Sequence, residues 1–297
     1  MAKLVLSQQP YSVAQTNEPH LPNEPFTVND LDPTIREAFP KLTAFNKIQL
    51  AVAKTVMQTD DSIVVNAPTG SGKTVILELA MVKLACHAKD STFRILYLAP
   101  TRSLCAEKFQ DWKVRFAPLG ISCIQFDGDN AVDDLSKLNS YRLILSTPEK
   151  WEVFTRHWDD QNVSSVLRPI RLLLIDEIQV INDSERGSNL ELVVSRMKYI
   201  DKRLGREQPH IGDTPESIRY IAVSACIPNV VDFAAWLKND RNVIPFTFDE
   251  TNRTTRIERH VLNFPCASNS YKFEMNLNYK LPAIIDQYSR QKPTLVF

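Results

Sequence analysis

Residues 67–74, with the sequence APTGSGKT, constrain the fold more than any other part of the chain. They follow a short apolar run at residues 63–65, which is typical of a strand buried on both faces. After them, apolar residues recur at helical spacing without Gly or Pro. A strand, a glycine-containing turn, Lys-Thr and a helix in this order form the pattern of a phosphate-binding loop. The sequence therefore predicts a site for a nucleoside triphosphate.

Individual residues of this loop have distinct expected roles. Gly70 and Gly72 allow backbone N–H groups to turn toward an anion, and the N-terminus of the following helix adds its positive dipole end. Lys73 would reach the terminal phosphates, and the Thr74 hydroxyl would ligate Mg²⁺. Ala67 stands where the general pattern has Gly. The predicted nucleotide-binding residues of the loop are Ala67, Pro68, Thr69, Gly70, Ser71, Gly72, Lys73 and Thr74.

A carboxylate pair leaves a later apolar strand. Residues 170–175 (IRLLLI) are predicted to form a buried strand, and Asp176 and Glu177 follow it directly. Asp176 would hold Mg²⁺, as such a carboxylate usually does through water, and Glu177 would orient and deprotonate the attacking water. The solvated end of a strand is the ordinary alternative for such a pair. Together with a phosphate-binding loop, we interpret the pair as the second half of a hydrolysis site.

Strands and helices alternate along most of the chain. Further strands are predicted at residues 93–99, 121–126, 141–146 and 218–223, with helices between them. This alternation predicts an α/β fold with a mostly parallel sheet sandwiched by helices, and with the ligand at the carboxyl ends of the strands.

Other segments give weaker patterns. Residues 201–217 are polar with Gly and Pro breaks, which indicates a surface insertion. Beyond Pro245 the pattern is mixed, with a strand expected at 261–264, a short helix at 284–290, and another strand beginning at 293–297.

Composition excludes several classes of site. Lys and Arg balance Asp and Glu at 35 each, so any basic surface for nucleic acid must be local. The five cysteines are scattered without a CxxC pair, which argues against zinc and disulfides and suits a reducing cytosol or nucleus. No apolar run approaches the roughly 20 residues of a membrane span, so no membrane partner is expected.

Two polar residues suggest ligand contacts outside the loop. Gln49 lies in a helical stretch ahead of the loop, and its amide both donates and accepts, as recognition of the adenine edge requires. Arg102 lies where a predicted strand ends and a helix begins, a position suited to a phosphate. The alternatives are an exposed helical Gln and a solvated surface Arg.

Six short motifs together resemble those of superfamily 2 helicases, in the same order and spacing. They are Gln49, APTGSGKT at 67–74, APTR at 99–102, TPEKW at 147–151, DEIQ at 176–179 and SAC at 224–226. Among DExH-box helicases, residues 109–120, 191–198 and 227–237 resemble the meiotic crossover-promoting ATP-dependent DNA helicases. The resemblance implies a RecA-like ATP-binding domain, the cofactors ATP and Mg²⁺, a nuclear location and a role in meiosis.

The resemblance also implies a domain layout and a nucleic-acid partner. The first RecA-like domain is expected at 31–250, and a connector with the truncated start of a second RecA-like domain at 251–297. Before them, prolines among Gln, Asn and Ser without periodicity predict a disordered N-terminal arm at 1–30. The partner would be single-stranded or branched DNA, with RNA less favoured. Its sugar–phosphate track would face Arg102, Gly128 and Thr147. The catalytic residues would be Glu177, Lys73 and Gln179.

Two positions depart from the family pattern. Gln179 stands where the family has His, and Cys226 stands where it usually has Thr. Gln donates and accepts as a neutral His does, whereas Cys is a weak donor. Coupling of hydrolysis to unwinding is therefore open. An RNA-remodelling DExH helicase and a nucleotide-binding interaction module without unwinding activity remain alternatives, while a small-molecule kinase is disfavoured by the DEIQ and SAC motifs.

Overall fold

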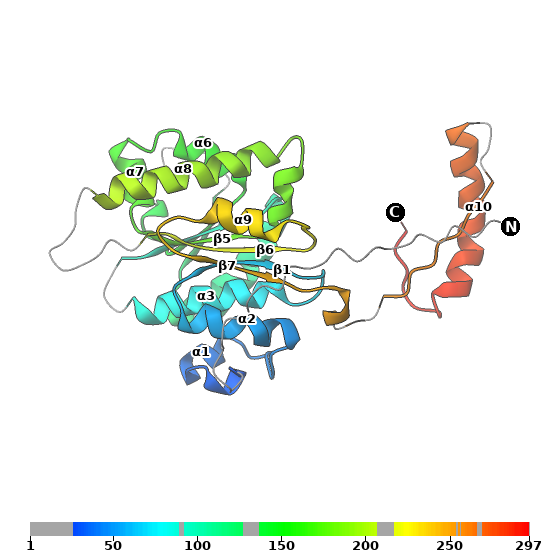
Figure 1. The fold of residues 1–297 in the computed structure, drawn as a ribbon, viewed down its shortest axis with the longest axis horizontal. Coiled ribbons are helices and arrows are strands. Elements are labelled where there is room, and N and C mark those ends of the chain that lie inside the picture. Colours follow the sequence, from blue (N-terminus) through cyan, green and yellow to red (C-terminus); the bar gives the residue numbers. More distant parts are fainter. Residues whose placement is uncertain are drawn as a thin grey trace. The chain divides into compact units, whose positions relative to one another are not determined.

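The computed structural model describes residues 26–88, 92–126, 137–206, 217–253, 255, 257–265 and 269–296 (Figure 1). The chain divides into two compact units, residues 1–254 (unit 1) and residues 255–297 (unit 2). Unit 1 contains the sheet and every motif described above.

Unit 1 is built on one parallel sheet. In the described residues the sheet has seven strands in the order β3-β4-β2-β5-β6-β1-β7, and every neighbouring pair is parallel. The strands are β1 (Ser62–Asn66), β2 (Arg94–Leu98), β3 (Cys123–Phe126), β4 (Leu143–Ser146), β5 (Ile170–Ile175), β6 (Arg219–Ser224) and β7 (Val243–Thr247). The predicted α/β class with a parallel sheet is confirmed.

Helices cover both faces of this sheet (Figure 1). One core includes residues of α1 (Pro33–Glu37), α2 (Lys47–Gln58), α3 (Lys73–His87) and α4 (Arg102–Arg115). The other includes residues of α6 (Pro148–Thr155), α7 (Gln161–Leu167), α8 (Gly187–Arg206) and α9 (Val230–Leu237). Short 3₁₀ helices are η1 (Val28–Asp30), η2 (Ala117–Leu119), η3 (Ile178–Asn182) and η4 (Glu250–Asn252).

Side chains alternate between the two faces of the sheet along each strand, so helices must cover both faces. In β1, Ile63 and Val65 join the core beneath α2 and α3, while Val64 joins the core on the opposite face. Successive side chains of a strand point to opposite faces, so an apolar strand must be covered twice. Within the described residues, no helix combines the length and the hydropathy needed to span a membrane.

The structure corrects two expectations in unit 1. The segment at 201–217 was expected to be a surface insertion, but α8 continues through residues 201–206; residues 207–216 lie outside the described residues. Strand β7 was not predicted. It is an edge strand in which Pro245 pairs with Val64, and an edge is where a sheet tolerates proline.

Both ends of the chain also differ from expectation. The short helix predicted at 284–290 is the end of α10 (Ser270–Tyr288), and the strand expected at 261–264 does not form. Of the strand expected to begin at 293–297, residues 293–296 are not in a strand and residue 297 lies outside the described residues. A strand needs a hydrogen-bonded neighbour, and the described residues of unit 2 contain no strand with which these segments could pair. At the start, Val28 is buried within η1, whereas residues 1–25 of the expected arm lie outside the described residues.

Candidate nucleotide site

The strand order brings the predicted nucleotide residues to one place. The phosphate-binding loop follows β1, the carboxylate pair follows β5, and the SAC motif begins at the end of β6. These three strands are neighbours in the order β5-β6-β1. Because they are parallel, their carboxyl ends share one edge of the sheet, the usual ligand position in such folds.

The loop has the backbone conformation of an anion-binding turn. Gly70 and Gly72 both have φ of 76°, a left-handed conformation that glycine adopts without a steric penalty. Lys73 opens α3, and its Nζ donates to the carbonyls of Ala67 at 2.9 Å and Pro68 at 3.1 Å. The Ser71 hydroxyl oxygen is buried and has no hydrogen-bond partner among the described residues. A bound ligand would satisfy such a group, so the loop fits an anion.

Helix α2 is tied to this loop through two amide side chains. Asn46 is the N-cap of α2, and its Oδ1 accepts from the backbone N–H groups of Ile48 and Gln49. Its Nδ2 donates to the Ser71 carbonyl at 2.8 Å, and Gln49 Nε2 donates to the Gly72 carbonyl at 3.1 Å. The contact of Gln49 in this structure is therefore with the loop, and its recognition of adenine stays a prediction. Sequence reasoning missed Asn46, which the N-cap pattern with Gln three residues on signals.

The lysine and the carboxylate pair lie within electrostatic reach of one another. Burial lowers the pKa of Lys73, and the charges of Glu177 and then Asp176 oppose that shift. Burial raises the pKa of Asp176, against the lowering effect of a hydrogen bond from Tyr97. The distance from the Tyr97 hydroxyl to Asp176 Oδ2 is 2.8 Å. A lysine and two carboxylates at one sheet edge can hold a phosphate and a divalent cation together.

A chain of hydrogen bonds links the DEIQ and SAC motifs. Gln179 Nε2 donates to Glu177 Oε2 at 2.5 Å, and the Ser224 hydroxyl donates to Gln179 Oε1 at 2.8 Å. Gln179 thus donates and accepts at once. Glu177 has φ of 53°, and this left-handed conformation costs a non-glycine residue about 1–2 kcal/mol. Backbone strain of this kind is common at functional sites.

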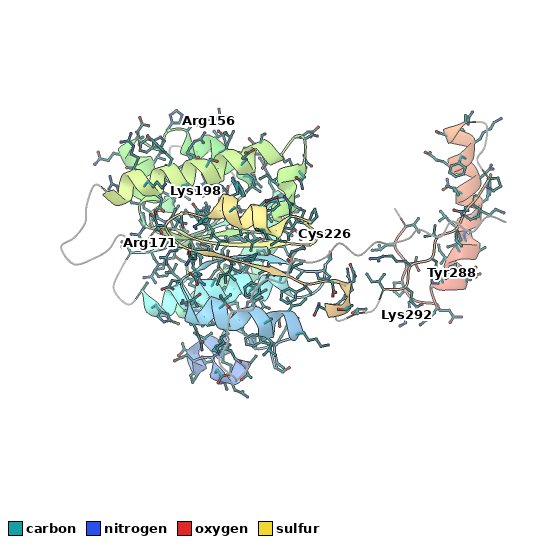
Figure 2. All side chains as sticks on the ribbon, viewed as in Figure 1. Arg156, Arg171, Lys198, Cys226, Tyr288 and Lys292 are labelled. Carbon is teal, nitrogen blue, oxygen red and sulfur yellow. The ribbon has the colours of Figure 1, made fainter. Side chains whose placement is uncertain are left out.

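The predicted nucleic-acid residues lie along the same edge, beyond β5. Arg102 is an exposed residue at the start of α4, and Thr147 is the buried N-cap of α6. Their strands, β2 and β4, are neighbours and pair Leu98 with Ser146. Gly128 lies outside the described residues. Cys226, labelled in Figure 2, is exposed.

Comparison with known proteins identifies the family. Residues 46–233 match the DEAD/DEAH box helicase family. The chain belongs to that family. It is 39% identical over 296 residues to the probable ATP-dependent DNA helicase HFM1 of Homo sapiens. It is 33% identical over 264 residues to the ATP-dependent DNA helicase MER3 of Saccharomyces cerevisiae.

These relatives are much longer than the chain. The two alignments cover 97% and 86% of this chain and 20% of each relative, so the chain spans about a fifth of the length of these relatives. Among solved structures, the fold is similar to that of the DEAD-box helicase Mss116 bound to ssRNA and UDP-BeF. The TM-score is 0.60 with 16% identity, covering 76% of this chain and 46% of that one.

Besides Asn46, another residue outside the motifs contacts the loop of this DEAD/DEAH box helicase chain. Arg253 Nη1 donates to the Thr69 carbonyl at 2.9 Å, and Arg253 Nε donates to Glu250 Oε2 at 2.7 Å. It follows β7, which lies beside β1, so it reaches the same edge. Burial lowers the pKa of Lys73 most, and the Arg253 charge lowers it further. No sequence pattern pointed to Arg253.

The oxygen donors at this edge fit Mg²⁺. Asp176 offers a carboxylate and Thr74 a hydroxyl, and Lys73 lies beside them. Among the described residues no group of three or more His, Cys, Asp or Glu could hold a metal. The Asp176 carboxylate and the Thr74 hydroxyl suit Mg²⁺, which binds through one or two carboxylates together with phosphate oxygens and water.

Proposed function

We propose that this chain is the ATP-binding domain of an ATP-dependent DNA helicase. The observation that carries the proposal is the meeting of the phosphate-binding loop, the DEIQ motif and the SAC motif at the carboxyl ends of β1, β5 and β6. In a longer protein, a second RecA-like domain would complete the site and the grip on the DNA strand. The proposed limits of the first domain are residues 31–250, with a connector from 251.

Each residue of the site has a role that its chemistry supports. Lys73 and the loop N–H groups bind the terminal phosphates. Thr74 and Asp176 would hold Mg²⁺, which neutralises charge that develops on the phosphate oxygens. Glu177 orients the attacking water and accepts its proton. Gln179 holds the Glu177 carboxylate and connects it to the motif at β6.

The proposed substrate is single-stranded or branched DNA. The two curated relatives described above are named as DNA helicases, and this favours DNA over RNA. The resemblance to meiotic crossover-promoting helicases supports a nuclear role in meiosis. Arg102 and Thr147 start helices beyond neighbouring strands, and we place the sugar–phosphate track there, with Gly128 as a further contact.

Nucleotide binding tests the core of the proposal. Lys73→Ala removes the only side-chain cation of the loop segment 67–74, and a charged hydrogen bond contributes about 1.5–3 kcal/mol. We expect the affinity for a fluorescent ATP analogue with Mg²⁺ to fall at least about 10-fold. The control is Lys238→Ala, an exposed residue after α9. Equal affinities for wild type and Lys73→Ala would show that the loop does not bind the nucleotide.

A further inference from the structure

Tyr97 lies in the middle of the sheet and contacts the carboxylate proposed to hold Mg²⁺. It belongs to β2, which pairs with β5, the strand that leads into Asp176. The Tyr97 hydroxyl donates to Asp176 Oδ2 at 2.8 Å. The tyrosine is fully buried and Asp176 is 9% exposed. A buried hydrogen bond to a charged acceptor is among the stronger ones in proteins.

The backbone of Asp176 is fixed by the same strand. Asp176 N donates to the Leu98 carbonyl at 2.9 Å, which extends the β2–β5 pairing one residue beyond the strand. Strand β2 therefore holds Asp176 twice, once through its backbone and once through the hydroxyl of Tyr97. Both contacts approach from the interior of unit 1.

The ring of Tyr97 is itself held by the core. It packs edge-on against Trp112 of α4, with ring centroids 4.9 Å apart and an interplanar angle of 79°. The Trp112 indole N–H donates to Glu78 Oε1 at 2.8 Å, and Glu78 also pairs with Arg115. Packing between α3 and α4 thus sets where the tyrosine hydroxyl lies, and little freedom remains for it to follow a moving carboxylate.

We propose that Tyr97 is a positioning residue for Mg²⁺ binding by Asp176. By engaging Oδ2 from inside the core, the hydroxyl restrains the carboxylate in one orientation before the metal binds. Hydrogen-bond partners of metal ligands typically contribute about 10–100-fold to metal affinity. This inference rests on the proposed function, because it assumes that Asp176 is the metal-binding carboxylate.

Tyr220 provides a matched control. It lies on β6, which pairs with β5 on the side opposite β2, and it is as fully buried as Tyr97. Its hydroxyl is buried and has no hydrogen-bond partner within the part of the chain that the structure describes. Tyr97→Phe and Tyr220→Phe therefore delete the same atom from equally buried rings on either side of β5. Only the first removes a contact with Asp176.

The test measures Mg²⁺ binding rather than turnover. A fluorescent ATP analogue is bound to the 297-residue chain, first in EDTA and then across a Mg²⁺ titration. Wild type, Tyr97→Phe, Tyr220→Phe and Asp176→Asn are compared, and thermal unfolding is recorded for each. We expect Tyr97→Phe to raise the Mg²⁺ concentration for half-maximal effect about 10-fold. Its nucleotide affinity in EDTA should equal that of wild type, and Tyr220→Phe should leave the Mg²⁺ requirement unchanged.

The outcomes separate this inference from the proposed function. If Asp176→Asn raises the Mg²⁺ requirement and Tyr97→Phe does not, Tyr97 has no positioning role and the metal assignment stands. If Asp176→Asn leaves the requirement unchanged, Asp176 is not the metal ligand and the inference falls with that assignment. An equal rise in Tyr97→Phe and Tyr220→Phe would attribute the effect to the loss of a buried hydroxyl in general, and would also overturn the inference.

Discussion

Two halves of one sheet edge differ in how their polar residues are held. At the ends of β1, β5 and β6 (the nucleotide half), Ser71, Lys73 and Asp176 are each less than 10% exposed. At the ends of β2 and β4 (the outer half), Thr147 is also buried, but Arg102 is exposed at the start of its helix. Buried polar groups need partners, so a change to one in the nucleotide half should disturb its neighbours. A contact made by the exposed Arg102 in the outer half should instead be screened by salt.

The largest expected effect comes from a pair of glycines in the nucleotide half. Gly70 and Gly72 share φ of 76°, but a Cβ at Gly72 would overlap the Gln49 amide nitrogen, whereas a Cβ at Gly70 meets nothing within 4 Å. Gly70→Ala should therefore add only backbone strain of about 1–2 kcal/mol. Gly72→Ala should in addition displace the Gln49 amide, whose hydrogen bond to the Gly72 carbonyl contributes about 0.5–1.5 kcal/mol.

Chemical denaturation and nucleotide titration of the two glycine variants check this expectation. The free energy of unfolding should fall more in Gly72→Ala than in Gly70→Ala, and the affinity for the fluorescent ATP analogue should fall in the same order. Identical losses in both variants would mean that the link between Gln49 and the loop does not hold the loop in place. The coupling expected between neighbours in the nucleotide half would then be absent at this position.

A smaller effect is expected at Asn46. Asn46→Ser keeps a good N-cap oxygen for α2 but removes the amide that donates to the Ser71 carbonyl. A neutral hydrogen bond contributes about 0.5–1.5 kcal/mol, so nucleotide affinity should fall about 2–10-fold. Asn269→Ser, at the N-cap of α10 in unit 2, is the matched control. A loss of affinity equal to that of the control would assign Asn46 to helix capping alone.

The smallest effect is expected in the outer half. Arg102→Ala should weaken binding of labelled single-stranded DNA a few-fold without changing base preference, because phosphate contacts carry no base information. Between about 50 and 200 mM salt, the slope of log affinity against log salt should fall by about 1. The control is Arg203→Ala, an exposed arginine on α8. A salt-independent affinity, or one untouched by Arg102→Ala, would place the DNA track elsewhere.

Sequence reasoning succeeded where chemistry and local pattern coincide. The turn at Gly70 and Gly72 has the backbone conformation that glycine there implied, and the apolar run before Asp176 is a central buried strand. Tyr97 and Arg253 could not be predicted, because each acts across a long sequence separation. Tyr97 reaches Asp176 from a neighbouring strand, and Arg253 reaches Thr69 from beyond β7. Such contacts depend on strand order, which no local pattern encodes.

The errors in strand prediction have the same cause, because local sequence patterns do not show which strands are neighbours in the sheet. Val243–Thr247 contains Pro245, which argues against a strand unless the strand lies at an edge, and the edge position is known only from the sheet. Residues 261–264 have apolar character but no strand partner among the described residues of unit 2, and Val261 is 87% exposed. Apolar composition alone does not supply the hydrogen-bonded neighbour that a strand requires.

The left-handed conformation of Glu177 bears on how this domain responds to selection. Glycine at that position would relieve backbone strain of about 1–2 kcal/mol, but it would also cost about 0.4–1 kcal/mol by adding conformational freedom to the unfolded chain. The same substitution would delete the carboxylate proposed to activate water. Selection for heat resistance alone would therefore tolerate Gly at position 177, and clones that carry it would have lost the hydrolysis proposed for this site.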